Sequence, residues 1–176
     1  MLARRRELTP SEAHNVSSAL DVALRFLAHR PRSEREISQR LLRAGFTSEA
    51  ATAVIASLKR HALVDDAAFA SYWVAQRQQF RPRAARVLQS ELRSQGVEPA
   101  LAAEAASVAE VDPEDDAYRA GWRRARQLRS LDRPTFERRL GQFLQRRGYA
   151  WDTVGPVVDR LAEEVGLGDA PDAQAQ

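Results

Sequence analysis

The sequence predicts an all-α protein built from three tandem three-helix repeats in an elongated, curved array. Apolar residues recur three and four positions apart along the 176 residues, and the alternation typical of strands is absent. Gly45, Gly96 and Gly148 are spaced 51 and 52 residues apart, which indicates an internal repeat. Units in such arrays contact mainly their neighbours, so the arrays are usually extended and suit extended partners.

Alignment on these glycines brings four further positions into register. They are Pro31, Pro82 and Pro134; Ile37, Leu88 and Leu140; Leu41, Leu92 and Leu144; and, directly after the glycine, Phe46, Val97 and Tyr149. Proline suits the first turn of a helix, where its missing N–H has no partner to lose. Apolar residues four positions apart form a buried stripe, and glycine ends a helix in the left-handed conformation. Each repeat is therefore expected to contain a central helix of about 13 residues.

Flanking helices complete each repeat in the same order. The expected helices cover 17–30, 33–45 and 47–63, then 65–79, 82–96 and 98–111, then 115–131, 134–148 and 151–165. In the first of them, Leu20, Leu24 and Leu27 share a face. Ser33 and Glu36 have the spacing of a capping box, and "TPSE" predicts a further short helix from Thr9-Pro10.

These elements predict five segments. They are a basic N-terminal segment at 1–17, repeats at 18–64, 65–111 and 112–165, and a flexible acidic tail at 166–176. The absence of cysteine excludes disulfides and thiolate metal sites. No run of about 20 apolar residues is present, and no apolar region follows the basic start "MLARRRELTPSEAH". We therefore expect a cytoplasmic protein.

The charge is unusual in kind more than in amount. The net charge is +3, and Lys59 is the single lysine among 27 basic residues. A GC-rich genome explains an excess of arginine, and so does a need for guanidinium groups that bind carboxylate or phosphate bidentately. Residues 118–147 carry ten arginines against two acids. Such a block either faces a polyanion or an acidic protein, or forms a solvated helix face.

Two carboxylate pairs stand at matching joints between repeats. Asp65-Asp66 and Asp115-Asp116 are both expected to cap helices, because aspartate suits the positive end of the helix dipole. A metal or acid–base role needs further converging ligands, and the sequence offers no such set. The histidines lack metal-ligand spacing, and nucleotide-binding and hydrolase motifs are absent. The sequence therefore predicts no enzyme, cofactor or metal.

The aromatic residues at the same joints follow helical spacing. Phe69, Tyr72 and Trp73 share one helix face, and Tyr118 and Trp122 repeat the pattern. Packing between repeats is the expected role of both groups, with stacking on nucleic-acid bases as the alternative.

Three stretches resemble the RecX family of regulators of the RecA recombinase. They are "RPRSEREISQRLLRAGF", "ALVDDAAFASYWVAQR" and "VLQSELRSQGV". The resemblance is strong from Ala19 to Val97 and weaker from Ala117 to Leu161. One departure is Ala62, where the family often has glycine; alanine there predicts that the preceding helix ends without a left-handed cap.

The resemblance implies a function that the residues alone do not give. It implies a non-enzymatic, cofactor-free monomer that lodges in the groove of the RecA–DNA filament. Such a protein lowers the ATPase, coprotease and strand-exchange activities of RecA in recombination and SOS repair. It also implies that single- and double-stranded DNA are contacted weakly or through RecA.

Arginines of the second and third repeats are the candidate contacts with RecA or DNA. They are Arg77, Arg81, Arg83, Arg86, Arg93, Arg123, Arg124, Arg126, Arg129, Arg138, Arg139, Arg146 and Arg147. A direct basic helical DNA-binding module is the alternative function, and a helical scaffold for another protein is a third.

Overall fold

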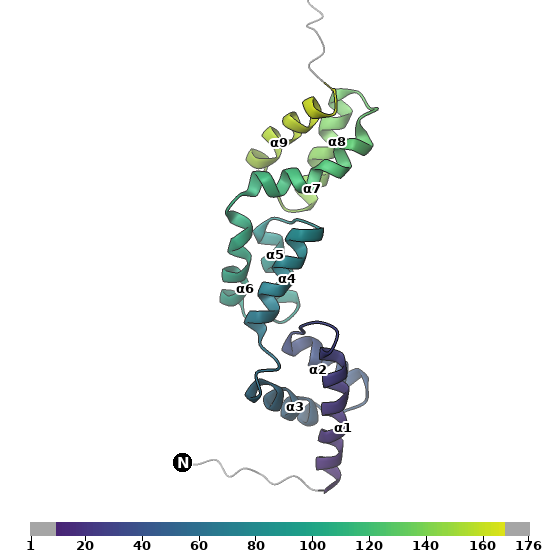
Figure 1. Cartoon of the computed structure of the whole chain (residues 1–176), viewed down its shortest axis with the longest axis vertical. Helices are drawn as coiled ribbons and strands as arrows, with labels where there is room; N and C mark the ends of the chain where they lie inside the picture. Colours follow the sequence, from purple (N-terminus) through teal and green to yellow (C-terminus); the bar gives the residue numbers. More distant parts are fainter. Residues whose placement is uncertain (1–9, 168–176) are drawn as a thin grey trace, which may run out of the picture. The chain divides into compact units, whose positions relative to one another are not determined.

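The computed structural model describes residues 10–167. Within this range the chain forms nine α-helices and one short 3-10 helix and no strand, which confirms the all-α class (Figure 1). The elements are α1 (Pro10–Leu27), α2 (Glu34–Arg43), α3 (Ser48–Arg60), α4 (Asp66–Phe80), α5 (Ala85–Ser94), α6 (Pro99–Ala106), η1 (Ser107–Glu110), α7 (Pro113–Leu128), α8 (Arg133–Arg146) and α9 (Trp151–Glu164). Three tandem three-helix repeats are confirmed; the curvature of the array stays a prediction.

The N-terminal helix differs from the prediction. The short helix expected at Thr9-Pro10 is not separate, because α1 runs without a break from Pro10 to Leu27. The predicted boundary after residue 17 therefore lies inside a helix. Residues 1–9 of the basic segment, with the Thr9 cap, and residues 168–176 of the acidic tail lie outside the described residues.

One compact unit comprises the chain up to Tyr72 together with Arg93–Glu98. In it α1 packs against both α2 and α3. The predicted face of α1 is confirmed in part: Leu20 and Leu27 pack against the core, but Leu24 is 40% exposed, and the fully buried residues of the helix are Ala19 and Ala23. Small residues at this contact let the helices approach closely. The core also contains Ile37, Leu41, Ala51, Val54, Leu58 and Val64.

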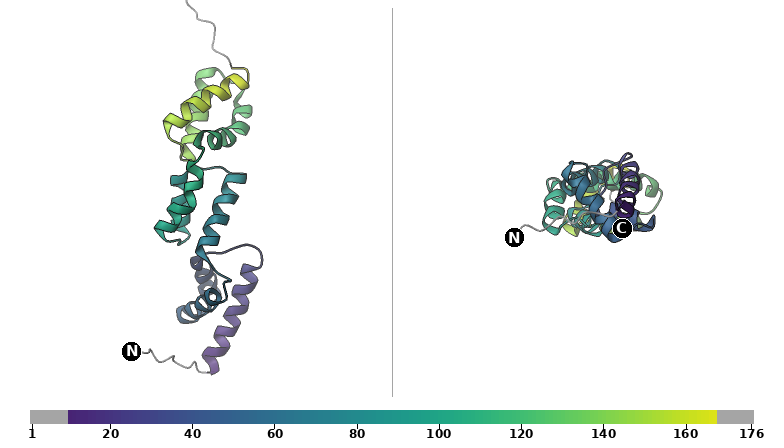
Figure 2. Two further views of the ribbon diagram at one scale, coloured as in Figure 1. Left: turned by 60° about the vertical axis from the view of Figure 1, so that its left-hand side comes forward. Right: turned by 90° about the horizontal axis from the view of Figure 1, so that it is seen from below.

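The other compact unit comprises Trp73–Leu92 and the chain from Pro99 onward. Here α7, α8 and α9 pack against one another, as the green-to-yellow helices of Figure 2 show. The largest fully buried side chains of its core are Phe136, Leu140, Leu144, Tyr149 and Leu161. Burial of each such side chain stabilises the fold by roughly 1.5–3 kcal/mol. The predicted apolar positions of the third repeat are confirmed as core.

The three aligned glycines end their helices as predicted. Their φ angles are +89° at Gly45, +89° at Gly96 and +96° at Gly148. A Cβ at Gly96 would stand 2.6 Å from Cβ of Arg35, and one at Gly148 would stand 2.3 Å from Cγ2 of Val87. At Gly45 nothing lies within 4 Å. Residues of the preceding repeat thus cover the helix end at Gly96 and Gly148, and the first of the three helix ends is open.

Two of the three central helices begin after the proline that was predicted to lie in their first turn. Pro31 and Pro82 precede α2 and α5, and only Pro134 lies in the first turn of its helix. The central helices accordingly have 10, 10 and 14 residues. In the first repeat Ser33 takes the cap position and accepts a hydrogen bond from the N–H of Glu36, which confirms the predicted capping box.

The prediction for Ala62 is wrong. This residue has a φ of +54°, so α3 does end in the left-handed conformation although the residue is alanine. The N–H of Leu63 donates to the carbonyl of Leu58 at 2.9 Å and completes the helix end. An alanine in this conformation is strained by roughly 1–2 kcal/mol.

Candidate functional site

The predicted contact arginines differ in their contacts and in their exposure. Four donate to carboxylate or carbonyl oxygens of the fold and are called the internal arginines: Arg77, Arg83 and Arg147 are half-buried, whereas Arg86 is exposed. Arg124 is half-buried and donates to the side chain of Gln127. The others are exposed: Arg81, Arg93, Arg123, Arg126, Arg129, Arg138, Arg139 and Arg146.

The first two internal arginines share one carboxylate. Glu91 of α5 accepts from Nε of Arg77 at 2.8 Å and from Nη1 of Arg83 at 3.0 Å. It also accepts from Nε1 of Trp73 at 2.9 Å. The guanidinium of Arg77 lies over the ring of Trp73, 4.4 Å from its centroid. A ligand would have to break these bonds to reach either arginine, so both are structural.

The other two internal arginines join the second repeat to the third. Nε of Arg86 donates to the carbonyl of Gly148 at 2.5 Å, and Nη1 of Arg147 donates to the carbonyl of Pro82 at 3.0 Å. The backbone N–H of Ala84 donates to the carbonyl of Arg147. Burial lowers the pKa of Arg147, and the positive charges of Arg83 and Arg81 lower it further. These cations therefore crowd one another in this region.

Beside this joint lies a groove of about 660 Å³. The end of α4, the connection to α5, the outer side of α7 and the end of α8 form its walls. None of the residues that line it is acidic. We call it the arginine groove; it is lined by Arg81, Arg119, Arg123, Arg124, Arg146 and Arg147, together with Phe80 and Phe143. An anion is the ligand that this lining favours.

A second hollow of about 590 Å³ lies along α7, next to the arginine groove. It shares Arg123 and Gln127 with the arginine groove and adds Trp122, Arg126 and Arg129. The ring of Trp122 stacks on Tyr118, with centroids 5.9 Å apart and planes inclined by 26°. Trp122 is 37% exposed, so its predicted role in packing between repeats is wrong.

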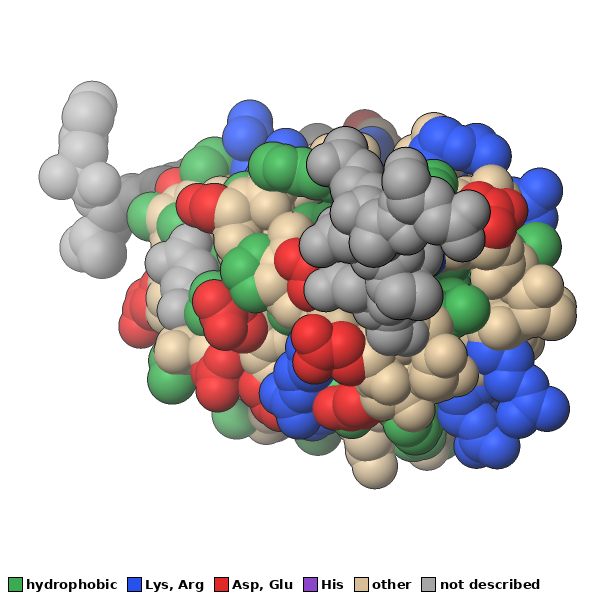
Figure 3. Space-filling model, turned by 90° about the horizontal axis from the view of Figure 1, so that it is seen from above, with side chains coloured by type: hydrophobic (Ala, Val, Ile, Leu, Met, Phe, Trp, Pro, Cys, Tyr) green, Lys and Arg blue, Asp and Glu red, His purple; other side chains and the backbone are tan. Residues whose placement is uncertain are grey.

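Among the described residues, no carboxylate lies within ion-pair distance of Arg123, Arg126 or Arg129. The neighbouring Arg119 is different, because it pairs with Asp115 and Asp116. In Figure 3 some basic side chains lie beside acidic ones, and others form a patch without acidic neighbours in that view. The free guanidinium groups are therefore available to an external anion.

The first carboxylate pair caps helices, as predicted, but it caps two of them. Oδ1 of Asp65 accepts from the N–H of Ala67 at the start of α4. Oδ1 of Asp66 instead accepts from the N–H of Glu34, the first residue of α2, at 3.0 Å. Burial raises the pKa of Asp66. The carboxylate thus fastens the start of α4 to the start of α2.

The prediction for the second pair is wrong. Asp112 caps α7, so Asp115 and Asp116 lie within its first turn. Asp116 is buried and accepts hydrogen bonds from Gln78 and Arg119. No group of three metal-ligating side chains occurs among the described residues. No helix in that part of the chain is long and apolar enough to cross a membrane.

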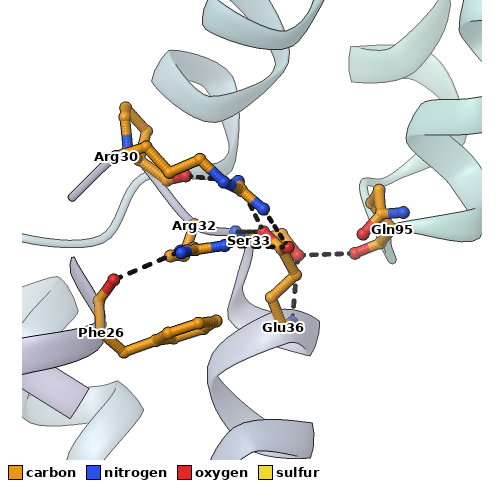
Figure 4. A network of polar contacts seen from close by, with 7 residues as sticks. Phe26, Arg30, Arg32, Ser33, Glu36 and Gln95 are labelled. Carbon is orange, nitrogen blue, oxygen red and sulfur yellow. Dashed lines mark hydrogen bonds and ion pairs between the residues drawn. The ribbon is translucent and has the colours of Figure 1, made fainter.

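The arginines of the first repeat provide a contrast, shown in Figure 4. Glu36 accepts from Nη2 of Arg30 at 2.6 Å and lies 3.6 Å from Nη1 of Arg32. The guanidinium of Arg32 covers the ring of Phe26 at 3.8 Å. Oγ of Ser33 donates to the carbonyl of Gln95 at 2.7 Å. The "RPRSE" segment therefore fastens the repeats together and does not present free charge.

Two exposed aromatic residues were not among the predicted contacts. Phe80 ends α4 and is 68% exposed beside the arginine groove, and Trp122 lies beside the second hollow. The signal in the sequence was their position: Phe80 directly precedes Arg81, and Trp122 directly precedes Arg123-Arg124. Helical spacing alone did not separate them from core aromatics such as Phe69, which is fully buried.

Three family models match consecutive parts of the chain. They describe the first, second and third three-helix domains of RecX and match residues 19–58, 65–105 and 112–158. Two solved structures share the fold. RecX from Lactobacillus salivarius is 18% identical, with a TM-score of 0.69 over 86% of this chain and 99% of that one. A second regulatory protein RecX is 19% identical, with a TM-score of 0.73 over 90% and 83%.

Curated relatives match over most of their length. The regulatory protein RecX of Streptomyces coelicolor is 36% identical over 86% of this chain and 81% of its own. That of Amycolatopsis mediterranei is 34% identical over 91% of both chains. That of Chlorobium limicola is 32% identical over 84% of this chain and 92% of its own. The chain belongs to the RecX family of regulatory proteins.

Proposed function

We propose that this protein inhibits the RecA recombinase by binding in the groove of the RecA–DNA filament. It would lower the ATPase, coprotease and strand-exchange activities of RecA in recombination and SOS repair. Its role is that of a cytoplasmic, non-enzymatic monomer without a cofactor. Family membership supports the regulatory part of the proposal. The single observation that supports the mode of contact is the arginine groove, which lacks an acidic lining residue.

The exposed arginines carry the contact in this proposal. Their guanidinium forks match carboxylates of an acidic protein surface and phosphates of bound DNA equally well. The internal arginines, Arg77, Arg83, Arg86 and Arg147, already donate to oxygens of the fold, so in this proposal their main role is to stabilise the scaffold. Inhibition follows if the protein binds a low-activity state of the filament better than the active one, which shifts the population toward it.

The DNA-dependent ATPase of RecA from the same organism tests the proposal. The protein is added below one copy per RecA, because a protein that bridges filament subunits acts at low stoichiometry. We expect a strong fall in ATPase that weakens as salt screens the arginine contacts. Unchanged ATPase at low and moderate salt would contradict the proposal.

A direct DNA-binding module is the second candidate function. The exposed Trp122 and Phe80 beside unpaired arginines favour it, because aromatic and basic residues together suit nucleic acid. Gel shifts on naked DNA, at the concentrations used for the ATPase, separate the two functions. Tight binding without RecA together with unchanged ATPase supports the module.

A further inference from the structure

We propose that the outer face of α7 binds single-stranded nucleic acid, with one base stacked on Trp122 and the adjacent phosphates on Arg123, Arg126 and Arg129. The inference deepens the proposed function, and its biological meaning rests on that function. Its test uses the protein alone, so the two can fail separately.

The ring of Trp122 is a prepared stacking surface. Tyr118 stacks on it from within the same helix, one turn earlier. Tyr118 is itself fixed, because its hydroxyl donates to Glu164 at 2.7 Å and the guanidinium of Arg160 lies 4.1 Å from its ring centroid. A base that stacks on Trp122 therefore meets a ring whose position is already set, which lowers the entropy lost on binding.

The charges around the ring suit a chain of phosphates. Arg123, Arg126 and Arg129 line the hollow with Trp122, all three are exposed, and none has an internal carboxylate among the described residues. The hollow shares Arg123 with the arginine groove, where Phe80 offers a second exposed ring. Aromatic rings interleaved with cations along one path are typical of single-strand binding.

The presence of the ring decides between the ligand classes. A duplex keeps its bases stacked inside, so it could use the arginines but not the face of Trp122. A carboxylate-rich peptide also satisfies the arginines and has no flat group for the ring. Only an unstacked base uses both features of the surface.

Fluorescence anisotropy of a labelled oligothymidylate of about 20 nucleotides tests the inference, with single-stranded and duplex forms titrated in parallel. We expect Trp122→Ala to weaken single-strand binding about tenfold, since stacking contributes roughly 1–3 kcal/mol per base. The duplex should change less than about twofold, and Trp122→Phe should restore most of the affinity. Trp151→Ala is the matched control, because Trp151 is 65% exposed on α9 and does not line either hollow.

Salt dependence separates the ring from the cations. Arg126→Gln and Arg129→Gln should each flatten the slope of log affinity against log salt by about 0.7, whereas Trp122→Ala should leave the slope unchanged. Trp122→Leu keeps apolar contact with Tyr118 and serves if the alanine variant does not fold, as circular dichroism reports. Equal losses for single strand and duplex, no loss at all, or tighter binding of polyglutamate than of the oligonucleotide would overturn the inference.

Discussion

Arginines at the start of the first repeat and arginines of α7 carry the same guanidinium group but differ in whether a carboxylate already binds it. Arg30 and Arg32 surround one carboxylate, Glu36, whose side chain is only 17% exposed. Arg123 and Arg126 line open hollows and lack a carboxylate partner among the described residues. To use Arg30, a ligand must first break an existing ion pair, but to use Arg123 it displaces only water and counterions.

The difference teaches that the availability of arginine, more than its abundance, marks a binding surface. Both regions look basic in the sequence, and the "RPRSE" segment carries the family resemblance most clearly. In the structure that segment holds the first repeat against the second, whereas Arg123, Arg126 and Arg129 of α7 have no carboxylate partner among the described residues. The same contrast appears at the aligned glycines, of which Gly96 and Gly148 are covered and Gly45 is open.

The largest effect is expected from alanine at the covered glycines. Gly148→Ala should lower the free energy of unfolding by about 3–4 kcal/mol, because left-handed strain adds to the clash with Val87. Gly96→Ala should cost nearly as much, since its new Cβ meets the immobile Cβ of Arg35. Gly45→Ala should cost only about 1–2 kcal/mol of strain. Urea unfolding of the three variants measures the order, and equal losses would contradict the covered-versus-open distinction.

A smaller loss is expected when a shared carboxylate is removed. Glu91→Ala should destabilise the fold by about 2 kcal/mol, because Arg77 and Trp73 lose their charged acceptor. Glu36→Ala should cost a similar amount in the first repeat. Thermal unfolding compares both with Glu137→Ala, whose carboxylate is more exposed and pairs with Arg133 along one helix. If Glu91→Ala lost no more stability than Glu137→Ala, the shared carboxylate would not be an important stabilising contact.

A gain of about 0.5–1 kcal/mol is expected from Ala62→Gly. Glycine relieves the left-handed strain at φ +54°, and part of that gain is offset by its greater freedom in the unfolded chain. Ala44→Gly is a suitable control, because Ala44 has a φ of −84° and should only lose stability. Denaturant midpoints measure both changes. Destabilisation by Ala62→Gly would mean that Ala62 is not strained.

The smallest effect concerns the pH dependence of Asp66. Its folded pKa is raised by burial, so the folded state holds this proton more tightly than the unfolded state. The protonated carboxyl therefore favours folding below the ordinary pKa of 3.8, and this contribution is lost as pH rises through the folded pKa. Asp66→Asn keeps the oxygen that accepts from Glu34. We expect it to be up to about 1 kcal/mol more stable than wild type at neutral pH.

The measurement is urea unfolding of both proteins across the acid range. The advantage of Asp66→Asn should shrink as pH falls toward 3.8. Asp65→Asn is the control, since Asp65 is exposed and caps only its own helix. If the advantage of Asp66→Asn grew as the pH fell, the claim that folding raises the pKa of Asp66 would be contradicted.

The sequence predicted those features that depend on local periodicity. Ile37, Leu88 and Leu140 are fully buried, and the three glycines have positive φ, because spacing along one helix determines both. The features that it missed depend on partners from other elements. Asp116 meets Gln78 of α4, and Arg86 meets a carbonyl of the third repeat. The spacing of residues along one helix does not reveal contacts with another helix. The structure was therefore needed to separate the internal arginines from those without internal partners among the described residues.

The most direct test of the central claim compares charge reversals in the two regions. Arg123→Glu/Arg126→Glu reverses free cations of α7, and Arg40→Glu/Arg43→Glu makes the same charge change on exposed arginines of α2. Circular dichroism first checks that both variants are as helical as wild type. Each variant is then added to RecA and DNA, and the ATPase of RecA is measured over a range of salt concentrations. We predict that the α7 variant loses most inhibition while the α2 variant keeps it. Equal inhibition by both variants would contradict the assignment of the α7 surface as the contact.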